Sequence, residues 1–86
     1  MKLEADEVKA ITLRLKKANG HLASVIRMLE EGAECEDALT QIAAVSKAIN
    51  RGGYALVATG LQRCLVEGGP DSVDIKKMEK LFLALA

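Results

Sequence analysis

The sequence predicts an all-helical protein, and three observations carry this prediction. Apolar residues recur in steps of three and four along most of the chain, which is the spacing of one face of an α-helix. No segment alternates apolar and polar residues over the length of a β-strand. The breaks between the periodic segments are few and short, so we expect a small number of long helices.

The first helix is predicted from Val8 to Leu29. Its apolar residues form one stripe at coiled-coil spacing: Val8, Ile11, Leu15, Ala18, Leu22, Val25 and Leu29. Asn19 and Gly20 interrupt the local propensity, because an interior glycine costs about 1 kcal/mol relative to alanine. The stripe continues through them, so one helix is expected. Gly32 stands where a helix commonly ends in a C-terminal cap.

A second helix is predicted to begin in the acidic segment around Cys35, because acidic residues in a first turn suit the positive end of the helix dipole. Apolar residues then recur in steps of four, three and four: Ala38, Ile42, Val45 and Ile49. The segment 50–53, Asn-Arg-Gly-Gly, has the composition of a turn, and the residues beyond it are again compatible with a helix. Periodicity alone therefore leaves open one helix of about 30 residues or two shorter helices.

The segment 68–72, Gly-Gly-Pro-Asp-Ser, is a break in any reading. Asp71 or Ser72 can cap a third helix, since both are favoured N-cap residues. The apolar positions of this third helix are Val73, Ile75, Met78, Leu81, Phe82 and Leu85.

Length and composition predict a single domain, residues 1–86, with a thin core. A chain of this size buries only about 60% of the surface that it exposes when unfolded. It has no tryptophan, and its two aromatic residues are Tyr54 and Phe82. We therefore expect self-association to complete the core.

The charges balance at 12 basic and 12 acidic residues, but they are segregated along the chain. Between Val8 and Leu29 there are five cations and no acid, and between Glu30 and Asp37 there are five acids and no cation. A DNA-binding protein needs a basic face rather than a basic total. The alternative interpretation is a solvated helix face.

A cytoplasmic location is predicted, with no membrane contact. The first ten residues, MKLEADEVKA, lack the apolar segment of a signal peptide. No run approaches the roughly 18 apolar residues of a membrane helix. Permanent disulfides are rare in the reducing cytoplasm, which favours a metal, redox or buried role for the two cysteines.

Cys35 and Cys64 are 29 positions apart. On one continuous helix they would be separated by about 43 Å, at 1.5 Å per residue, and could not meet within one chain. They could meet if two copies packed antiparallel about a two-fold axis, which would create two identical sites. If Gly52 and Gly53 instead turned the chain back, the thiols could pair within one subunit. A third alternative is that each cysteine is a small buried apolar residue.

Two thiolates alone can hold Cu(I), whereas zinc and nickel require three or four donors that include imidazole or further sulfur. The only histidine, His21, lies at the edge of the apolar stripe of the first helix. It is interpreted as a surface or boundary residue rather than a ligand. No nucleophile is paired with a base, so an enzyme is not predicted.

Several segments resemble the CsoR/RcnR family of inducer-released transcriptional repressors. They are RLKKANGHL at 14–22, IRMLE at 26–30, Cys35, TQIAAV at 40–45 and LQRC at 61–64. The resemblance implies a three-helix protomer whose long central helix pairs antiparallel in a homodimer, and two dimers that form a disc-shaped homotetramer. It also implies one continuous helix through Gly52 and Gly53, which would leave the glycine pair as an exposed weak point. Operator double-stranded DNA would bind a basic face to which Arg14 and Arg51 contribute, with Lys16 and Lys17 as weaker candidates.

The resemblance also bears on the inducer. Copper sensors of the family carry a histidine four residues before the second cysteine and often a tyrosine before the first, whereas this chain has Gly60 and Glu34 there. Nickel, cobalt and formaldehyde sensors also require that histidine. Two cysteines without imidazole resemble the persulfide-sensing, CstR-like branch.

This branch implies a repressor without metal or cofactor, released when an inter-subunit Cys35/Cys64 pair reacts with persulfide or polysulfide. A thiolate attacks the sulfane sulfur, and the facing thiol resolves the product into a bridge. The alternatives are a Cu(I)-responsive repressor that uses the same two thiolates and a helical protein-binding adaptor.

Overall fold

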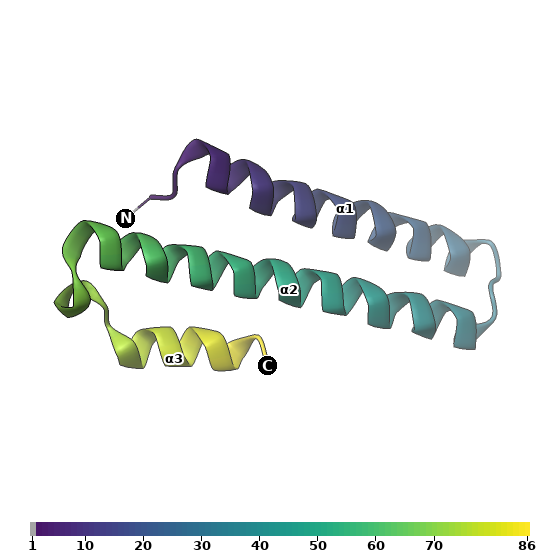
Figure 1. Ribbon diagram of the computed structural model, residues 1–86. Coiled ribbons are helices and arrows are strands. Elements are labelled where there is room, and N and C mark those ends of the chain that lie inside the picture. The colour runs from purple at the N-terminus through teal and green to yellow at the C-terminus, as the bar shows by residue number, and fades with distance from the viewer. Residues whose placement is uncertain (1) are drawn as a thin grey trace.

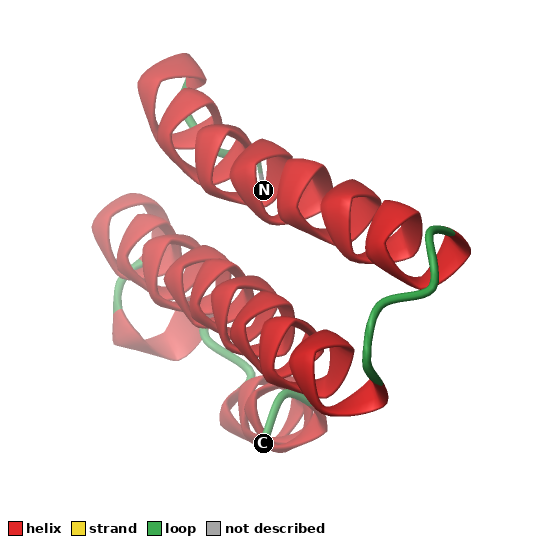
Figure 2. Ribbon diagram, turned by 90° about the vertical axis from the view of Figure 1, so that its right-hand side faces the viewer, coloured by secondary structure: helices red, strands yellow, loops and turns green. Residues whose placement is uncertain are grey.

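The computed structural model describes residues 2–86 of the protein. They form three α-helices and a short 3-10 turn: α1 (Ala5–Glu30), α2 (Cys35–Gly68), η1 (Pro70–Ser72) and α3 (Ile75–Ala84). The long helix α2 lies between α1 and α3, and both neighbours run antiparallel to it (Figure 1). The helices form one layer with extents of 53 × 26 × 12 Å (Figure 2). The predicted all-helical protomer with a long central helix is confirmed, and residues 2–86 contain no strand.

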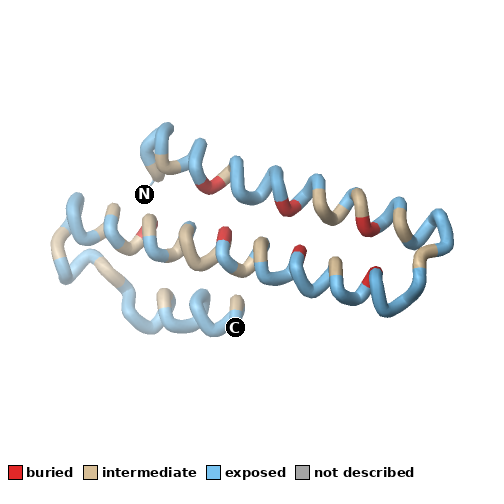
Figure 3. The backbone as a smooth tube through the Cα atoms, turned by 45° about the vertical axis from the view of Figure 1, so that its right-hand side comes forward, coloured by how far each residue is buried: buried red, intermediate tan, exposed pale blue. Residues whose placement is uncertain are grey.

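The core lies between α1 and α2, whose buried positions face each other (Figure 3). On α1 every seventh residue is buried, namely Ile11, Ala18 and Val25. On α2 the same spacing buries Ala38, Val45 and Gly52. Burial of a side chain such as Val25 contributes about 1.5–3 kcal/mol to folding. The heptad spacing that predicted the first helix therefore also defines its packing face.

Helix α1 begins at Ala5, three residues before the predicted start at Val8, whereas its predicted C-terminal end at Gly32 is confirmed. Asn19 and Gly20 lie inside α1, and no atom outside the helix backbone would meet a side chain at Gly20. Gly32 follows the helix with φ of +85°, the left-handed region that favours glycine. There the Ala33 amide donates to the Met28 carbonyl at 2.8 Å, the long bond of a Schellman cap.

The expectation that the glycine pair is an exposed weak point in α2 is wrong. Gly52 is buried and Gly53 is half-buried. A Cβ atom at Gly52 would lie 2.9 Å from Leu15 Cδ2 of α1, and one at Gly53 would lie 2.9 Å from Leu85 Cδ2. The pair therefore lets both neighbouring helices approach α2 closely, which offsets its low helix propensity.

The third helix begins later than the sequence indicated. Its N-cap is Asp74, whose side chain accepts a hydrogen bond from the Lys77 amide at 3.0 Å, and not Asp71 or Ser72. Val73 precedes the helix instead of lying on it. The Ser72 hydroxyl reaches back to the last turns of α2, where it lies 2.9 Å from the Cys64 carbonyl oxygen.

Most of the apolar surface is left uncovered in a single copy of the chain. Only five hydrophobic residues within 2–86 are buried. The three with exposed fractions of 3% or less are small, namely Ala18, Val25 and Val45. Large exposed side chains remain on all three helices, including Ile42, Ile49, Leu56, Val66 and Leu83. No helix in this part of the chain is both long and apolar enough to cross a membrane.

Candidate functional site

The two thiols lie at opposite ends of α2. Cys35 is the first residue of the helix and is exposed, while Cys64 lies near its end and is half-buried; both are free. Because α2 is continuous, 29 residues at 1.5 Å separate them by about 43 Å. The alternative in which both cysteines meet within one subunit is therefore wrong. The buried-residue interpretation is also wrong for Cys35.

Cys64 opens into apolar space between α2 and α3. A cavity of about 490 Å³ is lined by Gly60 and Cys64 of α2 and by Met78 and Leu81 of α3, among others. A second cavity of about 260 Å³ is also lined by Cys64 and Met78. The thiol is thus accompanied by a thioether from another helix, while Gly60, one turn earlier on α2, is buried and adds no side chain.

The sulfur donors at the C-terminal end of α2, Cys64 and Met78, are soft. Among residues 2–86 no three His, Cys, Asp or Glu side chains come together in a way that could hold a metal ion. Thiolate and thioether sulfur favour Cu(I), whereas borderline and hard ions prefer imidazole or carboxylate. The residues present therefore fit Cu(I), provided that a second chain brings its own Cys35 to Cys64.

A basic cavity of about 280 Å³ lies between α1 and α2. Arg14, Lys17 and His21 line it from α1 and Arg51 lines it from α2. The α1 residues follow one another in steps of three and four, so they share one helix face. The antiparallel packing brings Arg51 to the same place. No acidic residue lines the cavity, and within the described chain Arg14, Lys17 and Arg51 form no ion pair.

This cavity brings together three of the four basic residues that were predicted to contact DNA. Lys16 is exposed on α1 but does not line the cavity. Concave surfaces that collect cations attract phosphate, because the field of each cation adds to that of its neighbours. The arrangement can therefore accept an anionic backbone.

His21 was not predicted to belong to this basic group. Its Nε2 atom lies 2.6 Å from Oε1 of Gln41 on α2, which fixes the ring beside the cavity. The available signal was its position seven residues after Arg14 on the same helix face. His21 lies beside Gln41, which is 23 positions before Cys64 on α2, so it cannot bind a metal ion together with Cys64 of the same chain.

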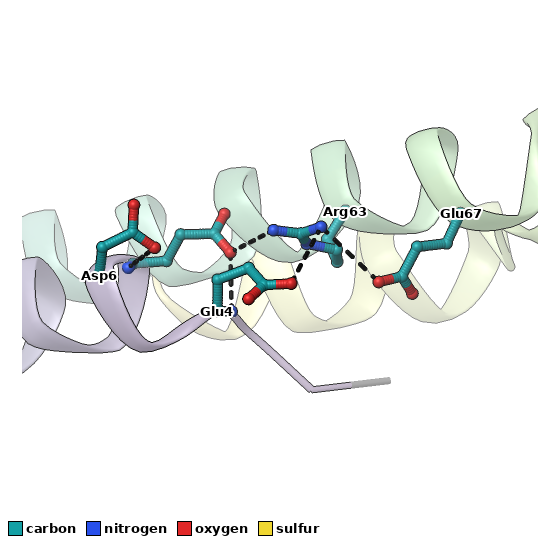
Figure 4. Close-up of polar contacts among 5 residues, drawn as sticks. Glu4, Asp6, Arg63 and Glu67 are labelled. Atoms are coloured by element: carbon teal, nitrogen blue, oxygen red, sulfur yellow. Dashed lines mark hydrogen bonds and ion pairs between the residues drawn. The ribbon is translucent and has the colours of Figure 1, made fainter.

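Arg63, directly before Cys64, forms a second feature that the sequence did not reveal. Its guanidinium donates a hydrogen bond to Glu7 Oε1 at 2.9 Å and lies 3.5 Å from Glu4 and 3.7 Å from Glu67 (Figure 4). Glu7 Oε1 also accepts the Glu4 amide at 2.8 Å, which closes the first turn of α1. The hydrogen bond from Arg63 is the largest cause that lowers the pKa of Glu7.

Comparison with known proteins finds one matching family and several similar proteins. Residues 7–85 match the family described as metal-sensitive transcriptional repressor. The chain is 39% identical over 59 residues to a copper-sensing transcriptional repressor CsoR of Mycobacterium ulcerans (strain Agy99), covering 69% of this chain and 50% of the relative. It is 38% identical over 77 residues to the copper-sensing transcriptional repressor CsoR of Mycobacterium tuberculosis (strain ATCC 25618 / H37Rv), covering 90% and 65%.

A further relative is the copper-sensing transcriptional repressor RicR of the same Mycobacterium tuberculosis strain. It is 38% identical over 61 residues, which cover 66% of this chain and 64% of that protein. The chain therefore spans about half to two thirds of the length of these curated relatives. No solved structure matches the chain.

Proposed function

The chain belongs to the metal-sensitive transcriptional repressor family, and on that premise we propose that it binds operator DNA and is released by Cu(I) at Cys35 and Cys64. The members of this family are repressors, so the prediction that the chain is not an enzyme is confirmed. The similar proteins are named copper-sensing, which favours the Cu(I) alternative over the persulfide interpretation.

The observation that carries the proposal is the placement of two free thiols at the two ends of one straight, continuous helix. Two copies of α2 that pack antiparallel bring Cys35 of one subunit to Cys64 of the other, twice per dimer. When Cys35 of one copy lies opposite Cys64 of the other, the two-fold axis crosses the two α2 helices between Ile49 and Asn50. Two thiolates then form a soft site that suits Cu(I).

Exposed apolar residues on α2 support this pairing. Ile42, Ile49 and Leu56 are spaced by seven residues and remain 40%, 44% and 46% exposed in one copy of the chain. A heptad stripe of this kind is the seam by which helices pair with one another. Exposed side chains on the other helices, such as Leu29 and Leu83, would then be available for the assembly of two dimers into a tetramer.

DNA binding is proposed at the basic cavity between α1 and α2. Arg14, Lys17 and Arg51 would neutralise phosphates there. Lys16, exposed on α1 outside the cavity, would be a weaker contributor. Binding of this kind releases counterions and weakens steeply with salt. If DNA affinity did not fall with salt, the helical protein-binding adaptor would be the better interpretation.

Communication between the two sites follows from the helix arrangement. Arg63 holds the beginning of α1 against the segment of α2 that carries Cys64. Bound Cu(I) would supply a strong link between the two thiolates of neighbouring subunits. A changed packing of the paired α2 helices would reach α1, and hence Arg14 and Lys17, through this contact. Release requires that the inducer bind the DNA-free state more tightly than the DNA-bound state.

The test uses a fluorescent duplex selected from a random pool by the metal-free protein. Anisotropy is followed while Cu(I) is added without oxygen, and about one Cu(I) per protomer should release the duplex, because two-fold pairing makes two sites per dimer. The Cys35→Ala and Cys64→Ala variants should still bind the duplex but should not release it. If Cu(I) left the DNA affinity of the unaltered protein unchanged, the copper proposal would be wrong.

A second candidate function, persulfide sensing, is favoured by one observation. Gly60 lines the same cavity as Cys64 and supplies no imidazole to a metal ion. A persulfide sensor needs only the two thiols and no imidazole. Glutathione persulfide would transfer its sulfane sulfur to one thiolate and release glutathione. The facing thiolate would then attack the inner sulfur of the new cysteine persulfide, release hydrogen sulfide and form a disulfide between subunits. Intact mass under non-reducing conditions tests this, since a covalent dimer must appear and must be absent in Cys35→Ala.

A further inference from the structure

We propose that Met78 is a third sulfur ligand of the Cu(I) site, an inference that rests on the proposed function above. Met78 comes from α3 and is half-buried. It lines both of the cavities that Cys64 lines, and Gly60 lines the larger of the two. One protomer would thus contribute a thiolate from α2 and a thioether from α3, and the other would contribute Cys35.

The position of Met78 is fixed by contacts at both ends of the α2–α3 pair. At one end the rings of Tyr54 and Phe82 pack with centroids 4.9 Å apart. At the other end the Ser72 hydroxyl lies 2.9 Å from the Cys64 carbonyl oxygen. Because α3 runs antiparallel to α2 (Figure 1), Met78 lies along α3 between these two contacts, and it lines both of the cavities that Cys64 lines.

The space around Cys64 suits a thioether ligand. The absence of a side chain at Gly60 leaves the larger cavity open next to the thiol, and its other lining residues are apolar. Methionine has three rotatable bonds, so its sulfur can move within such a space without displacing the helix. An uncharged sulfur ligand also adds no charge to a site that already contains two thiolates.

The chemistry of sulfur makes this contribution selective. Thioether and thiolate ligands are soft and suit Cu(I), whereas Ni(II) favours imidazole. Met78 would therefore strengthen Cu(I) binding where Gly60 offers no donor. The competing explanation is that Met78 only fills the interface between α2 and α3.

The first test measures Cu(I) affinity by competition with bathocuproine disulfonate for the full-length reduced protein. Leucine replaces methionine with little change in volume, so Met78→Leu should keep the fold. We expect its Cu(I) affinity to fall about tenfold or more. Loss of a residue that only supports a metal ligand already lowers metal affinity by about this factor, so loss of a ligand should cost at least as much. Met28→Leu, on α1 and outside the cavities that Cys64 lines, is the matched control and should bind as the unaltered protein does.

The second test observes the ligand directly. In selenomethionine-labelled protein loaded with Cu(I), X-ray absorption at the selenium edge should show a copper neighbour, and the signal should persist in labelled Met28→Leu and vanish in labelled Met78→Leu. The role of Met78 would be overturned, and the proposed function would stand, if Cu(I) binding depended on the thiols but showed no selenium–copper contact and was unchanged in affinity in Met78→Leu. No thiol-dependent Cu(I) binding in the unaltered protein would overturn the proposed function as well.

Discussion

Arg63 on α2 donates a hydrogen bond to Glu7 on α1 at 2.9 Å and so joins two residues that lie 56 positions apart in the chain. Both side chains are largely covered, with 21% and 25% of their surface exposed. Arg63 directly precedes Cys64, and Glu7 closes the first turn of the helix that carries Arg14 and Lys17. The pair thus joins the end of α2 that carries Cys64 directly to the helix of the basic cavity.

The pair predicts a loss of stability in acid. Its hydrogen bond holds the pKa of Glu7 below the usual value of 4.5, so the unfolded chain takes up this proton more readily than the folded protein. The stabilisation that ionised Glu7 contributes is complete above pH 4.5, the usual pKa of its carboxyl. It is lost as the pH falls through the lowered pKa of Glu7 in the folded protein. Glu7→Gln should therefore show a weaker dependence of urea unfolding on pH below 4.5.

Glu79→Gln is the control for this measurement, because Glu79 is exposed on α3 and forms no ion pair among residues 2–86. Its unfolding should follow that of the unaltered protein at every pH. Equal acid dependence in Glu7→Gln and the unaltered protein would show that the pair adds nothing to stability.

The glycines of the helices should respond differently to alanine. Gly20→Ala should stabilise the protein by about 0.5–1 kcal/mol, since no neighbour meets its Cβ atom. At Gly53 the new atom would lie 2.9 and 3.0 Å from the two methyl groups of Leu85. Overpacking should make Gly53→Ala less stable than Gly20→Ala by about 1 kcal/mol or more in urea unfolding. Equal gains at both positions would contradict the close packing of α3 on α2.

The cap of α3 gives a test of which residue begins this helix. Asp74→Ala removes the acceptor of the Lys77 amide and should lower the free energy of unfolding by about 1 kcal/mol. Asp71→Ala, three residues earlier in η1, should change it by only a few tenths of a kcal/mol. The two variants are compared by chemical unfolding. A larger loss in Asp71→Ala would place the functional cap where the sequence alone first suggested.

The basic cavity predicts a specific salt signature. Arg14→Ala should weaken DNA binding and reduce the slope of log affinity against log salt by about one. Lys80→Ala removes the same charge from α3, which packs on the other side of α2, and should leave the slope unchanged (Figure 1). Anisotropy titrations across a salt series measure both slopes. Equal effects of the two variants would mean that net charge, rather than this cavity, controls binding.

The sequence by itself determined which segments are helical, because helix formation depends on neighbours three and four residues away, but its periodicity left open whether residues 35–68 form one helix or two. The spacing of Ile11, Ala18 and Val25 predicted both the first helix and its packing face, and Gly32 predicted its end. The resemblance of the segments around Cys35 and Cys64 predicted the repressor family that the comparison confirmed.

Tertiary structure decided what depends on residues distant in the chain. Whether Gly52 and Gly53 are a weak point or a close contact depends on Leu15 and Leu85, which no local pattern connects to them. The contact of Arg63 with Glu7 and the thioether beside Cys64 likewise arise only when α1 and α3 pack against α2. Local spacing fixes a helix and its apolar face, but the register between helices fixes which side chains share a site, and that register is set by packing.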